Sequence, residues 1–305
     1  METIGIDTLK VFLPDFGVKP ENKLTIQPAS FLASSGELSG ETVLWKQGSE
    51  EVRGAKAYYN DPEKKVFVNL LPKGEGVKCF VQFSVPKVSD GSNYNLIERE
   101  KICEAVWGVQ AKLNEIGISG NLFDSKVSRI DTCRNLLTAD TVPSYFGVLQ
   151  TLQGKRMAKR DYGTTFLWGN QSQEICAYDK VAEVQLHSEL IAGLPDTLRI
   201  ETRLKKAKKV QDTLGLTYLK EVFSSEGYRQ VQEKYIETLE KNLFRYRGDV
   251  VQFLGQRDLE KQLRQYQEWY GRNFFSRFKS AKGVESLLKQ YSVEVISEAV
   301  LSVSN

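Results

Sequence analysis

The chain has 305 residues, of which 41% are hydrophobic and 27% are charged. These values are ordinary for packed globular proteins and exclude a mainly disordered or fibrous chain. The 42 basic and 39 acidic residues nearly cancel, so net charge alone does not predict a nucleic-acid partner. The sequence shows no run of about eighteen apolar residues and no basic leader before an apolar segment, so we expect neither a membrane span nor an export signal.

Cysteine and histidine usage excludes several kinds of site. The four cysteines, Cys79, Cys103, Cys133 and Cys176, include no C-x-x-C pair, which argues against a zinc ribbon or a thioredoxin-type centre. We expect reduced thiols in a cytoplasm. The single histidine, His187, cannot supply a histidine metal cage, and the absence of a P-loop or a dinucleotide-binding fingerprint argues against coupling to ATP.

In chain order, residues 1–205 predict an α+β fold with a mainly antiparallel central sheet flanked by helices. Short β-rich segments alternate there with turns rich in Gly, Pro, Asn and Asp. Apolar residues at helical spacing predict a helix over residues 95–116, and further helices are predicted near 144–152 and from about Tyr178. Strands are predicted at residues 4–13, 42–45, 55–60, 66–71, 78–85, 127–134, 164–168, 174–177 and 198–204.

After Lys205 the pattern changes to long amphipathic helices that continue to about residue 288, with breaks near 224–227 and 247–249. We therefore place a domain boundary between residues 1–205 and 206–305. Residues 199–209 hold six basic side chains and one acidic one, and residues 245–282 hold nine basic residues interleaved with aromatic ones. Cations suit DNA phosphates and aromatic rings suit bases. The alternative is a solvated helix face with its aromatic residues packed inward.

Two predicted strands each carry a carboxylate beside arginine. Residues two apart in a strand share a face, which groups Arg129 with Asp131, and Arg199 with Glu201 and Arg203. If the strands are neighbours, Asp131 and Glu201 could bind Mg²⁺ or Mn²⁺ between them while the arginines grip phosphate. The alternative is that the two carboxylates form structural ion pairs with Arg199 and Arg129 across the sheet.

Tyr178 is the candidate nucleophile. A phenol titrates near pH 10, so attack at neutral pH needs a polarised phosphate, a cation or a base. Lys180 can supply the cation, and Glu183 can act as a third metal ligand or as the proton acceptor. Lys205, Lys206, Lys208 and Lys209 follow the last strand as candidate phosphate contacts. The alternative for Tyr178 is a packed aromatic residue beside an exposed charge pair.

Several stretches resemble, in order, the replication initiators of filamentous phages, the gene II family, and more distantly the trans-acting initiators of rolling-circle plasmids. The match is dense only between about Ser128 and Lys205. The resemblance rests on the order and spacing of the motifs, because each motif alone is weak. The stretches are GIDTL at 5–9, SRID at 128–131, TTFLW at 164–168, AYDKVAE at 177–183 and RIETR at 199–203, with looser echoes at 277–279 and 283–288.

With the boundary after Lys205, we expect a catalytic nickase-like domain over residues 1–205 and a helical DNA-binding or accessory region over 206–305. The resemblance implies metal-dependent nicking and rejoining of an origin strand through a 5′-phosphotyrosine on Tyr178, with Asp131 and Glu201 as metal ligands. The implied partners are origin DNA, as duplex and extruded single strand, and a host polymerase and helicase in a bacterial cytoplasm, with no membrane. A homodimer on DNA is left open, as is the choice between phage, plasmid and integrated element.

Two other functions remain open from the sequence. A non-catalytic origin-binding or regulatory protein would keep the fold without the reaction. A metal nuclease that uses water would leave no covalent link between protein and DNA.

Overall fold

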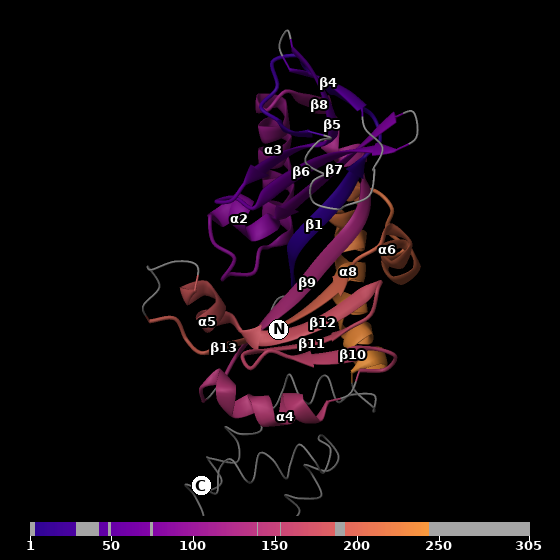
Figure 1. Ribbon diagram of the computed structural model, residues 1–305. Coiled ribbons are helices and arrows are strands. Elements are labelled where there is room, and N and C mark those ends of the chain that lie inside the picture. Colours follow the sequence, from indigo (N-terminus) through magenta and orange to yellow (C-terminus); the bar gives the residue numbers. More distant parts are fainter. Residues whose placement is uncertain are drawn as a thin grey trace, which may run out of the picture.

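A computed structural model of the chain describes residues 4–28, 43–47, 50–73, 76–138, 140–152, 154–186 and 193–243. Its centre is one sheet in which all strand pairs are antiparallel, in the order β10-β11-β12-β13-β9-β1-β7-β6-β5-β3, with β4 also paired to β5 (Figure 1). The strands are β1 (Gly5–Leu13), β3 (Thr25–Pro28), β4 (Val43–Gln47), β5 (Glu50–Asp61), β6 (Val66–Lys73), β7 (Gly76–Ser84), β9 (Lys126–Leu137), β10 (Ala158–Asp161), β11 (Thr165–Gly169), β12 (Gln173–Asp179) and β13 (Thr197–Leu204).

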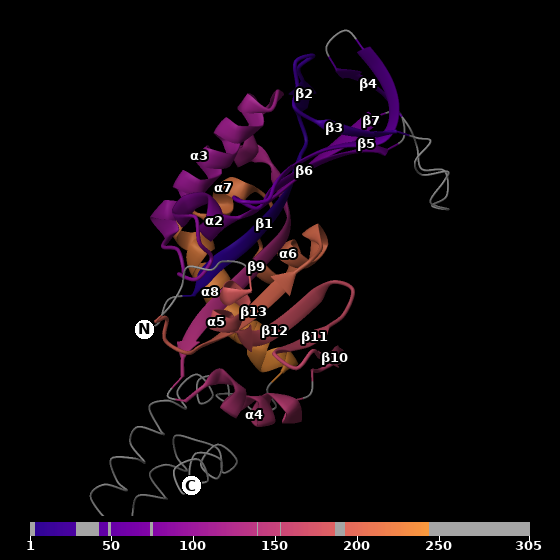
Figure 2. The same cartoon turned by 60° about the vertical axis from the view of Figure 1, so that its left-hand side comes forward.

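Helices cover one face of this sheet and its ends (Figures 1 and 2). They are α2 (Val85–Asp90), α3 (Arg99–Glu115), α4 (Phe146–Thr151), α5 (Lys180–Gln185), α6 (Ala207–Leu214), α7 (Leu219–Val222) and α8 (Ser225–Asn242), with the 3-10 turns η1 (Leu122–Asp124) and η2 (Val142–Tyr145). A separate two-stranded antiparallel sheet consists of β2 (Phe16–Val18) and β8 (Ile118–Gly120). The predicted fold class, an antiparallel sheet flanked by helices and followed by further helices, is confirmed.

The sequence periodicity explains which faces are buried. Along β1, Leu9, Val11 and Leu13 are buried on one face, as an alternating strand requires. In α3, Ile102, Val106, Val109 and other apolar side chains at helical spacing face the same core. This main core fills the half of the molecule around β1, β7 and β6, and a second core lies behind β11, β12 and β13.

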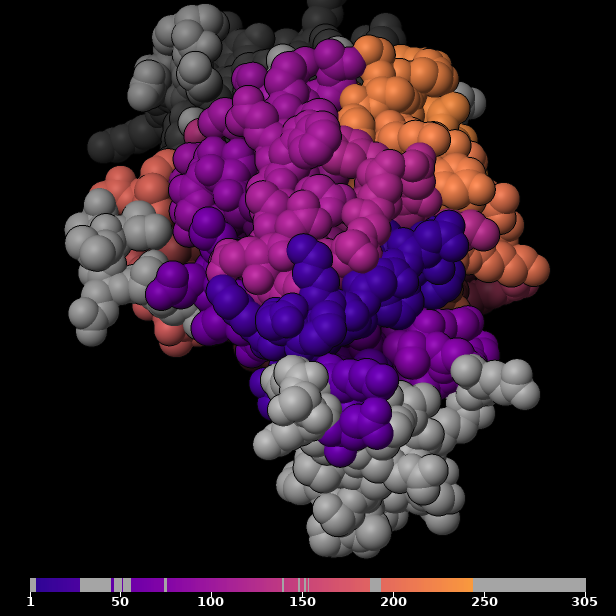
Figure 3. All heavy atoms as spheres, turned by 90° about the horizontal axis from the view of Figure 1, so that it is seen from above, coloured from indigo at the N-terminus to yellow at the C-terminus, as the bar shows by residue number. Residues whose placement is uncertain are grey.

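Helix α8 connects the two cores. The Tyr228 hydroxyl donates to the Ile4 carbonyl at 2.9 Å, and the Tyr235 hydroxyl donates to the Ile200 carbonyl at 3.0 Å. Seen from above, the orange C-terminal helices lie beside the magenta segment that follows α3, and the indigo N-terminal residues cross in front (Figure 3). In the described part of the chain, the helices after residue 205 therefore pack on the sheet itself. The boundary placed there stays a prediction.

The structure corrects several local expectations. Tyr178 lies in β12 rather than at a helix start, because α5 begins at Lys180 after the Asp179 side chain caps it by accepting from the Ala182 amide at 2.9 Å. The predicted helix at 144–152 begins as the 3-10 turn η2. Strands β2, β3, β8 and β10 and helix α2 were not predicted. His187 and the basic and aromatic region at 245–282 lie outside the described residues.

Among the described residues, no helix is both long enough and apolar enough to cross a membrane.

Candidate active site

Three rows of side chains cross β12, β13 and β9 on the sheet face opposite the second core. Directly paired residues of antiparallel strands share a face, and the register therefore defines each row. The rows are Tyr178, Arg199 and Asn135; then Cys176, Glu201 and Cys133; then Glu174, Arg203 and Asp131. The sequence argument required the two carboxylate-bearing strands to be neighbours, and the pairing of β9 with β13 meets that condition. Asp131 and Glu201 are diagonal neighbours, about 7–8 Å apart by ordinary sheet geometry.

Each carboxylate is held by an arginine of its own strand. Asp131 and Glu201 are only 2% and 3% exposed. Asp131 accepts from Arg129 Nε at 2.8 Å and Nη2 at 2.6 Å, and Glu201 accepts from Arg203 Nε and Nη2, both at 3.1 Å. The ion pairs therefore run along each strand, rather than across the sheet as the structural alternative expected. Arg129 and Arg203 keep about a quarter of their side-chain surface exposed, 27% and 25%.

The two carboxyls differ in how readily they ionise. Burial raises the pKa of Asp131 to about 7, and the negative charge of Glu201 adds to the rise while Arg129 opposes it. Burial also disfavours the charged form of Glu201, but Arg203 outweighs it and the pKa of Glu201 lies below its usual value. Glu201 is therefore charged while Asp131 stands near its midpoint at neutral pH. A cation between them would relieve this repulsion.

Tyr178 stands beside Glu201, while Asp131 lies further along the sheet in the row of Arg203. The Tyr178 side chain is half-buried, and its hydroxyl lies 3.5 Å from Glu201 Oε2. Burial raises the pKa of Tyr178 well above its usual value, and Glu201 adds to this, while Arg199 lowers it. The phenol is therefore protonated at neutral pH. Its ionisation in a reaction requires an added positive charge or a proton acceptor.

Lys180 and Glu183 form a pair next to the tyrosine. Lys180 is fully buried, its Nζ lies 5.8 Å from the centroid of the Tyr178 ring, and it donates to Glu183 Oε2 at 2.6 Å. Burial lowers the pKa of Lys180, Arg199 lowers it further, and Glu183 opposes both. Within the described residues, no three His, Cys, Asp or Glu side chains gather closely enough to hold a metal. The structure thus brings Asp131 and Glu201 together without Glu183.

Asp7 is a member of the site that sequence reasoning did not single out. Its Oδ1 accepts from Arg199 Nη1 at 3.3 Å. Arg199 is fully buried and also donates to Asn135 Oδ1 and to the Tyr94 carbonyl, both at 2.7 Å. Three neighbours therefore fix this arginine within the sheet face. The available signal was an acidic residue that regular alternation would place on the buried face of the strand with Leu9.

A small polar cavity of about 180 Å³ opens between Asp7 and Glu183. Ser84 lines it, and the buried Ser84 Oγ has no hydrogen-bond partner among the described residues. The other lining residues are Thr8, Lys65, Phe67, Gln82, Phe83, Lys87 and Asn93. The cavity gives the site a space next to its charged groups in which part of a polar ligand can lie.

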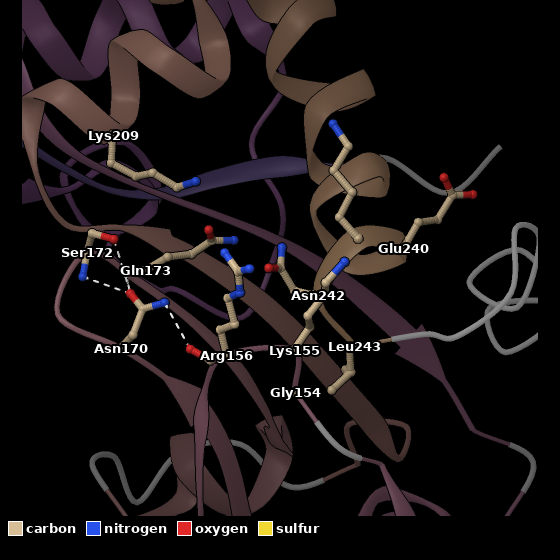
Figure 4. A pocket seen from close by; sticks show the side chains of 11 residues that line it. Gly154, Lys155, Arg156, Asn170, Ser172, Gln173, Lys209, Glu240, Asn242 and Leu243 are labelled. Carbon is tan, nitrogen blue, oxygen red and sulfur yellow. Dashed lines mark hydrogen bonds between the residues drawn. The ribbon is translucent and has the colours of Figure 1, made fainter.

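The predicted lysines are placed differently from one another. Lys205 donates to Glu174 Oε1 at 2.5 Å, while Lys206 and Lys208 are exposed at the start of α6. Lys209 lines a cavity of about 770 Å³ (Figure 4). In that view the Lys209, Arg156 and Lys155 side chains point into the cavity and the Glu240 carboxylate points away. Gln173 also lines it and points to the face opposite Tyr178, so this cationic cavity is separate from the tyrosine site.

Two thiols flank Glu201 in its row. Burial raises the pKa values of Cys133 and Cys176 to about 12 each. A soft metal such as zinc would have to displace both protons to use them as ligands. The neighbouring carboxylate oxygens instead suit a hard cation.

The burial of these thiols predicts an alkylation pattern. In native protein treated with iodoacetamide near pH 8 we expect only Cys103 to react, because Cys79, Cys133 and Cys176 are buried with pKa values of about 12 and should react roughly a thousandfold more slowly. Peptide mass spectrometry measures this, with urea-unfolded protein as the control in which all four react. Labelling of Cys133 or Cys176 as fast as Cys103 would contradict the placement of β9 and β12.

Residues 91–225 match a protein-family model that describes the N-terminal part of the gene II replication-associated protein. The matched segment contains Tyr178, Asp131 and Glu201, together with the other site residues of β9, β12, α5 and β13. Asp7 of β1 lies outside it. A search of curated proteins gave no match. The resemblance to the filamentous-phage gene II family that the motifs predict is therefore confirmed over residues 91–225, which connects this chain with the initiation of DNA replication.

Proposed function

We propose that this chain initiates rolling-circle replication by nicking one origin strand and later rejoining it through a 5′-phosphotyrosine on Tyr178. One observation carries the proposal. Tyr178, Glu201 and Asp131 come from three adjacent strands, lie on one face, and fall within the segment that matches the gene II family model. A nucleophile, a charged carboxylate and a second carboxylate with a raised pKa are the groups that a phosphoryl transfer needs.

The donor set fits Mg²⁺ or Mn²⁺. The arginines contact both oxygens of each carboxylate. Asp131 and Glu201 would therefore hold the cation through the remaining lone pairs of those oxygens, since an ionised carboxylate accepts about four hydrogen bonds or metal contacts. Glu183 is a proposed third ligand that must leave Lys180 to reach them. Bound there, the cation would supply positive charge that polarises the scissile phosphate.

The chain's own groups account for the rest of the step. The Tyr178 oxygen attacks phosphorus, the bond from phosphorus to the 3′ oxygen breaks, and that oxygen takes up a proton to leave a 3′ hydroxyl. Glu201, the carboxylate in contact with the phenol, receives the phenol proton. Lys180 stabilises negative charge near the ring. Arg129 and Arg203 face the phosphate oxygens with their exposed surface.

Rejoining reverses the same step. A 3′ hydroxyl attacks the phosphotyrosine, the bond between Tyr178 and phosphorus breaks, and the phenol regains its proton. Because the tyrosyl ester conserves the energy of the broken bond, no ATP is needed. The first 3′ hydroxyl serves as a primer, so a host polymerase and helicase are proposed partners, together with origin DNA as duplex and as extruded single strand.

The alternative function is origin binding without catalysis. The pairing of Asp131 and Glu201 with Arg129 and Arg203 favours it, because an ion-paired carboxylate is satisfied without a metal. Relaxation of a supercoiled origin plasmid in Mn²⁺ separates the two. Relaxation supports the nickase, and binding without relaxation supports the regulator.

A single adduct experiment tests the proposal. Protein incubated with Mn²⁺ and a labelled library of single-stranded oligonucleotides should form a complex that survives denaturing electrophoresis. Mass spectrometry of the protease-digested complex should place the nucleotide on the peptide that contains Tyr178. Cleaved DNA without any protein linkage would instead show a nuclease that uses water. Attachment at another tyrosine would refute the assignment of the nucleophile.

A further inference from the structure

The face of β1 and β7 opposite the main core carries aromatic and basic side chains in alternation. Phe12 pairs directly with Phe80 across the two strands, and their ring centroids lie 5.6 Å apart. Lys10 Nζ lies 5.3 Å from the Phe80 ring centroid, and Lys78 Nζ lies 5.6 Å from that of Phe12. We call these four residues the stacking platform. All four are half-buried, and they face away from Leu9, Val11 and Val81 in the main core.

The platform continues into the neighbouring strands. The row that contains Phe12 and Phe80 runs on through Asn69 of β6 to Tyr58 of β5. Lys56 Nζ lies 5.7 Å from the Tyr58 ring centroid, which repeats the pairing of a cation with a ring. Such a surface is broad and flat rather than a deep pocket, so it suits a chain of planar groups.

The platform is also continuous with the candidate active site. Along β1, Phe12, Lys10 and Thr8 share one face, and Lys10 pairs with Arg129 and Thr8 with Asp131 of β9. Two residues of a strand span about 6.6 Å, so Phe12 lies about 13 Å from Thr8. Thr8 lines the small cavity beside Asp7. A strand with its scissile phosphate at Tyr178 therefore reaches the platform within a few nucleotides.

The local charge favours an anionic ligand. Burial lowers the pKa of Lys10, and the positive charge of Arg129 lowers it further. The neighbouring Lys73 lowers the pKa of Lys78. Cations that repel one another in the free protein are stabilised most when a phosphate binds between them. The aromatic rings can stack with any base, independently of the sequence.

We infer that the stacking platform binds the bases and phosphates of single-stranded DNA next to the nick. A base that stacks on Phe12 or Phe80 displaces the ammonium group from the ring, and that group then contacts the adjacent phosphate. The inference deepens the proposed function and rests on it for the position of the nick. Binding by the platform is independent of sequence.

Equilibrium binding without divalent metal tests this inference. The probes are a fluorescein-labelled oligothymidylate and an abasic oligonucleotide of equal length, which carries the same phosphates without bases. For Phe12→Leu with Phe80→Leu, which keeps apolar volume and removes the rings, we expect oligothymidylate binding to weaken about tenfold or more. Binding of the abasic strand should stay within twofold. The salt dependence of binding should not change.

A charge variant should give the opposite pattern. Lys10→Gln with Lys78→Gln should weaken both oligonucleotides equally and lower the slope of log affinity against log salt by about 1.4, or 0.7 per phosphate contact. The control is Trp107→Leu in α3, an aromatic residue that is 60% exposed, which should bind both probes like the wild type. Thermal unfolding of each variant verifies that it is folded.

Each outcome decides the question. Equal weakening of both probes by the phenylalanine variant would overturn stacking, as would a loss of the same size with Trp107→Leu. If the folded Phe12→Leu, Phe80→Leu variant binds both probes like the wild type, the stacking platform does not bind DNA. That conclusion would hold even if the wild type forms the Tyr178 adduct. Base-dependent binding by the wild type without any adduct would keep the platform and refute the nicking proposal.

Discussion

Replacing Tyr178 with phenylalanine is expected to abolish nicking and covalent attachment while the protein still binds DNA. Removal of a nucleophile lowers turnover by on the order of 10⁴ or more. The fold should tolerate the change because, among the described residues, the hydroxyl makes one long hydrogen bond, 3.5 Å to Glu201. The free energy of unfolding should therefore change by less than about 1 kcal/mol. A nicking assay, denaturing electrophoresis and a gel shift on the same preparation measure all three properties.

The matched control is Tyr162→Phe. Tyr162 is 60% exposed in the turn between β10 and β11, a few residues from Thr165, which pairs with Tyr178. The exposed hydroxyl of Tyr162 is available to a phosphate that comes near this turn, and its loss should leave nicking within twofold of the wild type. Normal nicking by Tyr178→Phe, or loss of the adduct only in Tyr162→Phe, would show that the nucleophile is misassigned.

The second large effect is expected from the two carboxylates. Asp131→Asn and Glu201→Gln keep the side-chain shape and an oxygen for Arg129 or Arg203, but each removes a charge that metal binding requires. We expect each to lower Mn²⁺-dependent nicking by on the order of 10² to 10⁴, as losses at catalytic metal and electrostatic sites do. DNA affinity should be unchanged or slightly higher, because a negative charge has left the DNA-facing surface.

Glu174→Gln is the control for that pair. Glu174 stands on the same face, in one row with Arg203 and Asp131, but it is engaged by Lys205 and Arg203 at the end of β12 away from Tyr178. Its variant should nick within about threefold of the wild type. If all three variants lose activity equally, the losses reflect the ion-pair network of the sheet face, and the metal assignment to Asp131 and Glu201 fails.

Much of the site could be predicted because it follows from strand periodicity. Arg129 with Asp131, and Glu201 with Arg203, are spaced two apart in segments with clear strand character, so their common faces were evident. That these two strands are neighbours was a condition in the sequence argument, and the pairing of β9 with β13 meets it. The order of the motifs along the chain also predicts that Tyr178 belongs to this region.

Asp7 illustrates what periodicity misses. Regular alternation along β1 would place it on the same face as Leu9, inside the main core. A register shift between Ile6 and Thr8 marks a bulge there, which turns the Asp7 side chain toward Arg199. The stacking platform was missed for a related reason. Its rings meet only through the pairing of β1 with β7, about seventy residues later in the chain.

The sheet order has a consequence for how activity arises during synthesis. The contact between Asp7 and Arg199 spans 192 positions of sequence, and β1 is sandwiched between β7 and β9 rather than paired with a strand next to it in sequence. Long-range pairing of this kind forms slowly, since distant segments must meet before any of them gains stability. A nascent chain shorter than about two hundred residues therefore contains Tyr178 but lacks Glu201 and Arg203, so the proposed nicking site cannot form before β13 has been synthesised.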